Sequence, residues 1–179
     1  NIVNFSSGVL FYTPGRFPLT ELVSLPFLAK DNIALARALH SLAPKYLKKE
    51  FHDVHLMALP IPTLYQIHMR EPISKIADIK GKRVRASGRG LIAALKLLGV
   101  NPVLMPATKQ YESLQKGVIA GTIGTNATLV AFKVFEVTSF HMMANISATS
   151  IFNAMSNKFY DGLPKDLRSF VDNEASGPA

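Results

Sequence analysis

The sequence has 179 residues and contains no cysteine. This absence excludes disulfides, thiolate nucleophiles, iron–sulfur clusters and cysteine-type zinc sites. No stretch approaches the roughly 18 consecutive apolar residues that a membrane span needs, and no signal peptide pattern stands at the start. We therefore expect a chain that is not itself embedded in a membrane. The opening residues lack Met, so we expect either a removed leader or a missing N-terminal part of the fold.

Acidic residues are scarce relative to basic ones. The chain has 20 Lys and Arg against 12 Asp and Glu, a formal net charge of +8. Such an excess fits nucleic acid, an anionic membrane surface or an anionic small molecule. The densest basic group lies within residues 80–89 and has no aromatic side chains between its members, so we do not expect a nucleic-acid partner. A hydrophobic content of 48% predicts a folded globular protein.

Apolar periodicity predicts alternating strands and helices from residue 83 onward. Strands are predicted at 53–59, 83–86, 101–105, 118–123, 138–143 and 149–155, and helices at 31–49, 90–98, 109–116, 129–134 and 164–171. Pro44 is expected to kink or divide the first helix. The proline-containing segment 60–73 is predicted to be a loop or an interrupted strand. The pattern indicates an α/β fold with mostly parallel sheets.

In such sheets ligands bind beyond the carboxyl ends of the strands. Four segments lie there in the predicted arrangement: 85–90, 106–108, 121–128 and 147–150. We therefore expect the functional residues in these segments.

The stretch 80–99, KGKRVRASGRGLIAALKLLG, supports two interpretations. Gly88, Gly90 and Ala93 follow a strand and open a helix, as in a dinucleotide-binding loop. Arg85, at the end of the strand, would instead suit a carboxylate, because its planar guanidinium can donate two parallel hydrogen bonds. The acidic residue expected in a dinucleotide site is missing from the end of the next strand. The residues alone leave a solvated arginine open as well.

Metal binding and catalysis have little support in the sequence. His52 and His55 are three residues apart but lie at a helix-to-strand junction, and we expect solvated surface histidines there. No Gly-x-Ser-x-Gly motif occurs, and no paired carboxylates stand at predicted strand ends. We expect no metal, no cofactor and no enzymatic activity.

Four ordered segments resemble a known family. They are FYTPGRFPLTELVSLPFLAK at 11–30, PISKIADIKGKRVRASG at 72–88, LLGVNPVLMPATKQYESLQKGVIAGTIG at 97–124 and NKFYDGLPKDLRSFVDN at 157–173. Together they resemble the substrate-binding proteins of tripartite ATP-independent periplasmic (TRAP) transporters, of the DctP-like type. The resemblance runs from about Val9 to Asn173.

The resemblance implies a type II periplasmic binding protein with two α/β lobes. It would be a periplasmic receptor that captures a small organic acid and delivers it to the TRAP membrane permease subunits. The Arg of the family's K-G-x-K-x-R block binds the substrate carboxylate, and by position this role falls to Arg85. The alternative is a nucleotide-binding α/β domain or an enzyme that uses the turn Gly88–Ala93.

Further ligand-binding residues follow from the same resemblance. They are Phe17, Tyr65, Thr125, Asn126, Ser150 and Phe152. Ala120 stands where the family has an acidic residue, and Lys109 where a Glu is common, so the resemblance does not identify the acid.

The resemblance also implies a domain division. We expect a partial first lobe at 1–60, the Arg-bearing second lobe at 61–150, and a return toward the first lobe with a C-terminal helix at 151–179. N- and C-terminal parts of the family fold are expected to be absent. A partial lobe exposes sheet edges and apolar faces, which favours self-association.

Overall fold

The chain divides into two compact units in the computed structural model, which describes residues 3–13 and 15–175. Unit 1 comprises the described residues of Asn1–Val23, Asp31–Pro62 and Thr149–Ala179; unit 2 comprises Ser24–Lys30 and Thr63–Ala148. Residues 24–30, expected in the first lobe, therefore pack with unit 2. There the backbone N–H of Phe27 donates to the carbonyl of Ile146 over 3.0 Å.

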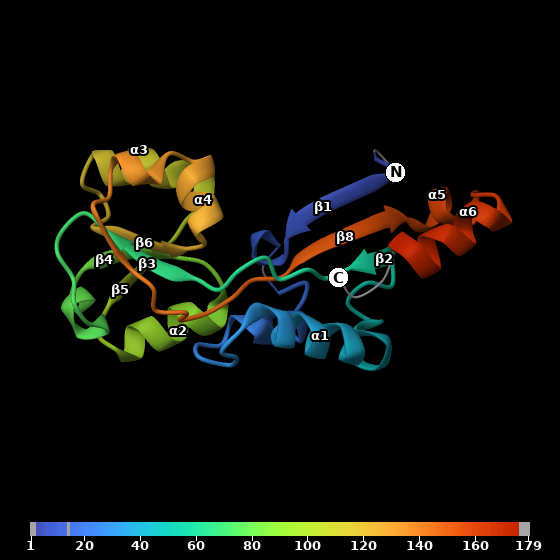
Figure 1. Cartoon of the computed structure of the whole chain (residues 1–179), viewed down its shortest axis with the longest axis horizontal. Helices are drawn as coiled ribbons and strands as arrows, with labels where there is room; N and C mark the ends of the chain where they lie inside the picture. Colours follow the sequence, from blue (N-terminus) through green and yellow to red (C-terminus); the bar gives the residue numbers. More distant parts are fainter. Residues whose placement is uncertain (1–2, 14, 176–179) are drawn as a thin grey trace. The chain divides into compact units, whose positions relative to one another are not determined.

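Unit 1 contains a three-stranded antiparallel sheet in the order β1-β8-β2 (Figure 1). Its strands are β1 (Phe5–Val9), β2 (Val54–Ala58) and β8 (Ile151–Ser156). β8 lies in the middle and pairs with both neighbours, and a bulge interrupts its ladder with β2 between Leu56 and Ala58. The sheet thus joins three segments that are far apart in the sequence.

The first helix of unit 1 is shorter than its apolar periodicity predicts. α1 (Asn32–Leu42) begins after Asp31, whose side chain accepts a hydrogen bond from the backbone N–H of Ala34 at 2.7 Å. Past Leu42 the chain continues as a wider π-helical segment, Ala43–Leu47. Pro44 explains the change, because its ring lacks an N–H and removes one hydrogen bond of the α-helical ladder. α5 (Asn157–Asp161) and α6 (Lys165–Phe170) follow β8.

Unit 2 contains a five-stranded mixed sheet in the order β5-β4-β6-β3-β7. Its strands are β3 (Gln66–Met69), β4 (Arg83–Ala86), β5 (Asn101–Leu104), β6 (Gly121–Gly124) and β7 (Phe140–Met142). β4 runs parallel to β5 and β6, whereas β3 is antiparallel to both β6 and β7. The α/β class is confirmed, but the expected mostly parallel pairing holds only for β5-β4-β6. Periodicity shows which face of a strand is buried and not which way the strand runs.

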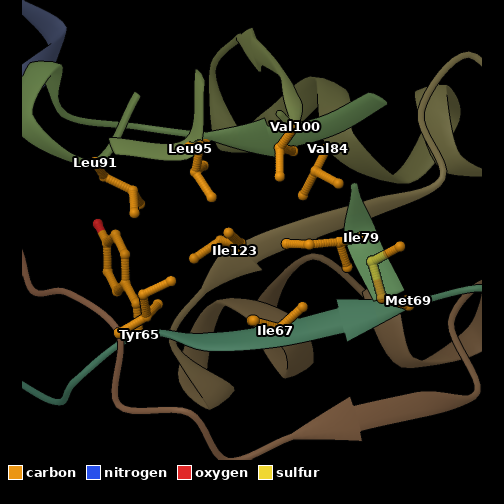
Figure 2. Close-up of a cluster of buried hydrophobic side chains, with 11 residues drawn as sticks. Tyr65, Ile67, Met69, Ile79, Val84, Leu91, Leu95, Val100 and Ile123 are labelled. Carbon is orange, nitrogen blue, oxygen red and sulfur yellow. The ribbon is translucent and has the colours of Figure 1, made fainter. Parts of the chain in front are cut away.

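One face of this sheet packs against α2 (Arg89–Leu97) and forms the main core of unit 2 (Figure 2). Val84, Ile67 and Ile123 come from three neighbouring strands, and Leu91 and Leu95 come from α2. All five are fully buried. The other face carries a smaller apolar cluster of Leu114, Ile119 and Val134, to which α3 (Gln110–Gln115) contributes Leu114.

Gly99 ends α2 as the sequence predicts. Its φ of 73° lies in the left-handed region that side chains disfavour. The next strand, β5, starts two residues later. This tight reversal returns the chain to the sheet beside β4.

Candidate functional site

Arg85 is buried at the carboxyl-terminal half of β4, with 4% of its surface exposed. Its neighbours Val84 and Ala86 face the main core, so strand alternation turns Arg85 to the opposite face. Its Nε donates to the carbonyl of Met105 at 3.2 Å, and Nη1 donates to the carbonyl of Ile123 at 3.3 Å. The guanidinium therefore reaches the ends of both neighbouring strands.

A row of polar side chains crosses the sheet on the face that carries Arg85. Arg85 pairs in register with Thr122 of β6, Thr122 with His68 of β3, and His68 with His141 of β7. Arg85, Thr122 and His68 are all buried, and His141 is exposed at the edge of the sheet. We call these four residues the polar row.

The two histidines of the polar row are in contact. Their Nδ1 atoms lie 3.1 Å apart, so one ring must accept the hydrogen bond that the other donates. Burial first, and then the charge of His141, lower the pKa of His68 from 6.5 to about 4, whereas a hydrogen bond with the backbone of Gly124 acts in the opposite direction. His68 is therefore neutral at pH 7. Sequence patterns do not predict this pair, because a single His in a short strand next to prolines shows no periodicity.

Gln110 of α3 also contacts the polar row and was not anticipated. Its side chain is 2% exposed, and its Oε1 accepts a hydrogen bond from Thr122 Oγ1 at 3.1 Å. A buried polar side chain of this kind is normally paired. Here the pairing fixes α3 over β6.

The glycines that suggested a dinucleotide loop have local structural roles. Gly88 precedes α2 with a φ of 90° and turns the chain from β4 into the helix. A Cβ added at Gly90 would lie 3.1 Å from both Leu25 Cδ2 and Ser24 Oγ. Close packing of the segment 24–30 therefore accounts for Gly90 without a phosphate.

The structure gives Thr125, Asn126 and Tyr65 different surroundings within unit 2. Thr125 is buried and caps α4 (Asn126–Ala131), because its Oγ1 accepts a hydrogen bond from the backbone N–H of Thr128 at 3.1 Å. This cap starts the helix three residues before the predicted Leu129. Asn126 is exposed. Tyr65 belongs to the main core, and its hydroxyl lies 3.4 Å from Ser87 Oγ.

The remaining predicted ligand residues, Phe17, Ser150 and Phe152, belong to unit 1. The Phe17 ring is buried and stacks on two others, with its centroid 4.9 Å from that of Phe51 and 6.3 Å from that of Phe152. Ser150 is fully buried, and its Oγ donates to carbonyl oxygens, including that of Ile151 at 3.1 Å. These residues thus form an aromatic group and a neighbouring buried hydroxyl within unit 1.

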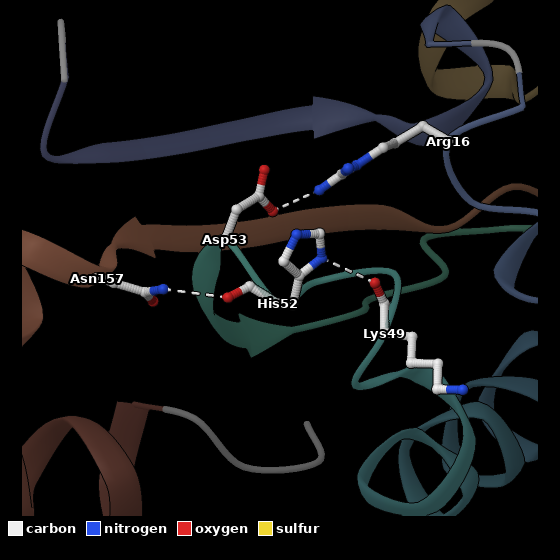
Figure 3. Close-up of polar contacts among 5 residues, drawn as sticks. All are labelled: Arg16, Lys49, His52, Asp53 and Asn157. Atoms are coloured by element: carbon white, nitrogen blue, oxygen red, sulfur yellow. Dashed lines mark hydrogen bonds and ion pairs between the residues drawn. The ribbon is translucent and has the colours of Figure 1, made fainter.

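His52 of unit 1 takes part in polar contacts with other protein groups (Figure 3). His52 is exposed as expected, and its Nδ1 lies 2.9 Å from the carbonyl oxygen of Lys49. Next to it in the sequence, Asp53 forms an ion pair with Arg16. His55 was expected to be solvated, but its ring stacks on Tyr160 with centroids 3.5 Å apart. Within 3–13 and 15–175 no group of three or more His, Cys, Asp or Glu could hold a metal ion. In the same ranges no helix has the length and apolarity of a membrane span.

Comparison with known proteins gives one family. The family model described as "Bacterial extracellular solute-binding protein, family 7" matches residues 2–177. The C4-dicarboxylate-binding periplasmic protein DctP of Vibrio cholerae is 31% identical over 151 residues, which are 83% of this chain and 46% of the relative. The protein of the same description from Rhodobacter capsulatus is 28% identical over 85% of this chain and 46% of the relative. The chain therefore spans about half the length of the curated relatives it matches.

Solved structures of TRAP solute-binding proteins have a backbone fold similar to that of this chain. A TRAP solute-binding protein from Rhodoferax ferrireducens with copurified benzoate has a TM-score of 0.91 and 30% identity, over 98% of this chain and 56% of that one. A marine metagenome TRAP solute-binding protein specific for aromatic acids, in complex with 3-hydroxybenzoate, has a TM-score of 0.90 and 29% identity, with the same coverage.

Proposed function

The chain belongs to the bacterial extracellular solute-binding proteins of family 7, and on that premise we propose that it forms part of a receptor that captures a small organic acid through Arg85. The observation that carries the proposal is the buried guanidinium at the carboxyl ends of β5 and β6, where it donates to the carbonyls of Met105 and Ile123. A charged hydrogen bond in such surroundings contributes about 1.5–3 kcal/mol to binding.

An aromatic monocarboxylate is the acid that we favour. Two relatives with TM-scores of 0.90 and 0.91 have benzoate or 3-hydroxybenzoate bound and are 29–30% identical to this chain. A C4-dicarboxylate is the second candidate, because the curated relatives at 31% and 28% identity carry that description.

The wider role follows from the family. We propose that unit 2 is the Arg-bearing lobe, that the receptor works in the periplasm, and that it passes its acid to TRAP permease subunits without chemical change. The curated relatives are described as periplasmic binding proteins, which supports this role. In the proposal Phe17, Tyr65, Thr125, Asn126, Ser150 and Phe152 contribute to ligand binding, and no cofactor takes part.

Calorimetric titration with benzoate, 3-hydroxybenzoate, succinate and L-malate tests the proposal. We expect the aromatic acids to bind more tightly than the dicarboxylates, and Arg85→Lys to weaken binding at least about tenfold, because a point charge cannot replace the planar fork. Arg83→Lys is the matched control: it changes the same residue type in the same strand, at an exposed position.

Three outcomes would contradict parts of the proposal. Equal losses for Arg83→Lys and Arg85→Lys would remove Arg85 from the site. Tighter binding of succinate than of benzoate would favour the second candidate. Thermal stabilisation by NAD or ATP but by none of the acids would favour a nucleotide-binding domain instead.

A further inference from the structure

The net positive charge of the chain lies entirely in unit 2. Unit 1 contains eight Lys and Arg and eight Asp and Glu, so its formal charge is zero. Unit 2 contains twelve Lys and Arg against four Asp and Glu, which accounts for the whole excess of +8. The proposed capture of an organic acid uses one of these cations, Arg85. The charge of unit 2 therefore exceeds what that acid needs, and its position in the unit shows what else it can attract.

Several turns of unit 2 meet at the end of its sheet where β4 begins. The backbone N–H of Arg70, just after β3, donates to the carbonyl of Ala120, and the N–H of Ala120 donates to the carbonyl of Arg83. On the other side of β4, the N–H of Gly81 donates to the carbonyl of Gly99, which follows α2. These hydrogen bonds bring segments that are far apart in the sequence to one end of the unit.

Six cations lie on these turns and at the ends of α2 and α3. We call this group the basic end, and its members are Arg70, Lys80, Lys82, Arg83, Lys96 and Lys116. Lys82 is half-buried and the other five are exposed. The guanidinium of Arg85, in contrast, is buried and reaches Met105 and Ile123 at the carboxyl ends of the neighbouring strands. The basic end is therefore separate from the candidate acid site.

Two members of the basic end have acidic partners. Lys82 forms an ion pair with Glu71, and Lys116 forms one with Glu112 at 2.6 Å. The other four members form no ion pair within residues 3–13 and 15–175. Four exposed positive charges thus face solvent together, and a surface with many negative charges would complement them.

Two exposed leucines stand next to these charges. Leu97 is 90% exposed and Leu98 is 49% exposed. They lie between Lys96 and Gly99, and a Cβ added at Gly99 would lie 3.1 Å from Lys80 Cε. The leucines are therefore flanked by two lysines of the basic end. Cations beside protruding apolar side chains suit a lipid surface, where the charges meet head groups and the apolar side chains enter the acyl boundary.

We propose that the basic end binds the surface of an anionic lipid bilayer, with Leu97 and Leu98 entering the outer part of its acyl region. An acidic protein fits less well, because protein interfaces are anchored by aromatic side chains in packed pockets. None of the residues at 70, 80–83, 96–99 and 116–118 is aromatic. The cations stand instead on separate turns, as a diffuse charge that matches a sheet of head groups. This binding goes beyond the proposed function, since it needs neither the organic acid nor a permease.

Sedimentation with lipid vesicles tests the proposal. We expect the chain to sediment with vesicles of phosphatidylcholine that contain about 30% phosphatidylglycerol, and not with vesicles of phosphatidylcholine alone. Raising the salt from about 50 mM to about 500 mM should lower the partition coefficient at least about tenfold, because counterions screen exposed charges. Arg85→Lys should bind these vesicles as the unaltered chain does, since Arg85 is buried outside the basic end.

A double charge variant tests the cations. Arg83→Gln combined with Lys96→Gln removes two exposed charges of the basic end. Lys48→Gln combined with Lys49→Gln is the matched control, because it removes two exposed charges from unit 1. We expect the first pair to lower the partition coefficient at least about tenfold and the control to change it less than about twofold.

A pair of leucine variants tests the apolar contribution. Leu97→Ala shortens the most exposed side chain beside the basic end, and Leu42→Ala shortens a leucine of unit 1 that is 50% exposed. We expect Leu97→Ala to weaken vesicle binding about threefold or more and Leu42→Ala to leave it unchanged. Melting temperatures from circular dichroism should stay the same in all variants, so that a loss of binding is not a loss of fold.

Several results would overturn the proposal. They are the absence of binding at about 1 mM lipid, equal binding to vesicles with and without phosphatidylglycerol, and equal effects within either matched pair. Binding to polyglutamate but not to the vesicles would assign the basic end to an acidic protein instead. Benzoate binding through Arg85 is measured without vesicles, so either proposal can fail without the other.

Discussion

His68 and His141 face each other across the β3–β7 ladder with their Nδ1 atoms 3.1 Å apart. One ring is buried and the other is exposed. The pair therefore links the interior of unit 2 to solvent through a single hydrogen bond that needs a neutral acceptor.

The stability of the chain should fall in acid because of His68. Its pKa is lowered from 6.5 to about 4 in the fold, so between these values the unfolded chain binds a proton that the folded chain does not. The contribution is fully present above about pH 6.5 and is lost as the pH falls through about 4, by about 3 kcal/mol in the free energy of unfolding. Urea unfolding at pH 7.5, 5.5 and 4.5 measures it.

Replacing the ring isolates this contribution. We expect His68→Gln to lower stability at pH 7.5 but to flatten its pH dependence between 6.5 and 4. His52→Gln, at an exposed position, serves as the control and should keep the wild-type slope. An unchanged slope in His68→Gln would show that other groups cause the acid sensitivity.

Two leucines of α2 provide a second test. Leu95 is fully buried in the main core, whereas Leu97 is 90% exposed. We expect Leu95→Ala to lower the free energy of unfolding by about 2–5 kcal/mol and Leu97→Ala to change it by less than about 0.5 kcal/mol. Urea unfolding followed by circular dichroism distinguishes them. Similar losses in both variants would mean that α2 packs through another face.

Gly121 should tolerate no side chain. A Cβ there would lie 2.0 Å from Met69 Sδ and 2.7 Å from the backbone carbonyl oxygen of His68, so the β3–β6 ladder would have to shift. We expect Gly121→Ala to cost about 3 kcal/mol or more of stability. Gly162→Ala is the control, since its nearest contacts of 3.4 and 3.5 Å are ordinary ones. A melting temperature of Gly121→Ala equal to that of the control would refute the expected clash.

Thr125 tests whether capping and ligand binding share one hydroxyl. Thr125→Ala removes the acceptor of the Thr128 N–H and should cost about 1 kcal/mol of stability. Thr125→Ser keeps a hydroxyl and should keep both stability and benzoate affinity. If Thr125→Ala binds benzoate as tightly as Thr125→Ser in calorimetry, the residue caps α4 but does not contact the ligand.

The sequence predicted the strand that carries Arg85 well. The boundaries of β4 are confirmed to the residue, because Val84 and Ala86 alternate with two arginines and Gly88 closes the segment. The basis for choosing Arg85 over Arg83 was the family resemblance. The structure adds a physical difference, because Arg85 is buried and Arg83 is exposed.

The polar row, in contrast to β4, could not be predicted from the sequence. β3 was predicted as a loop or interrupted strand because Pro60, Pro62 and Pro72 lie nearby, and the four-residue strand fits between them. Its neighbours in the sheet come from residues 121–124 and 140–142. Cross-strand partners so far apart in the sequence leave no local pattern, so Thr122 and His141 could not be assigned to His68.

The central position of β8 affects how the chain folds during synthesis. β1 and β2 both emerge from the ribosome long before residues 151–156, the strand to which each of them is paired. The segment 63–148, which contains the whole sheet of unit 2, is complete earlier. Unit 2 can therefore fold during translation before residues 151–156 are added, while β1 and β2 stay unpaired with β8 and open to chaperones until then.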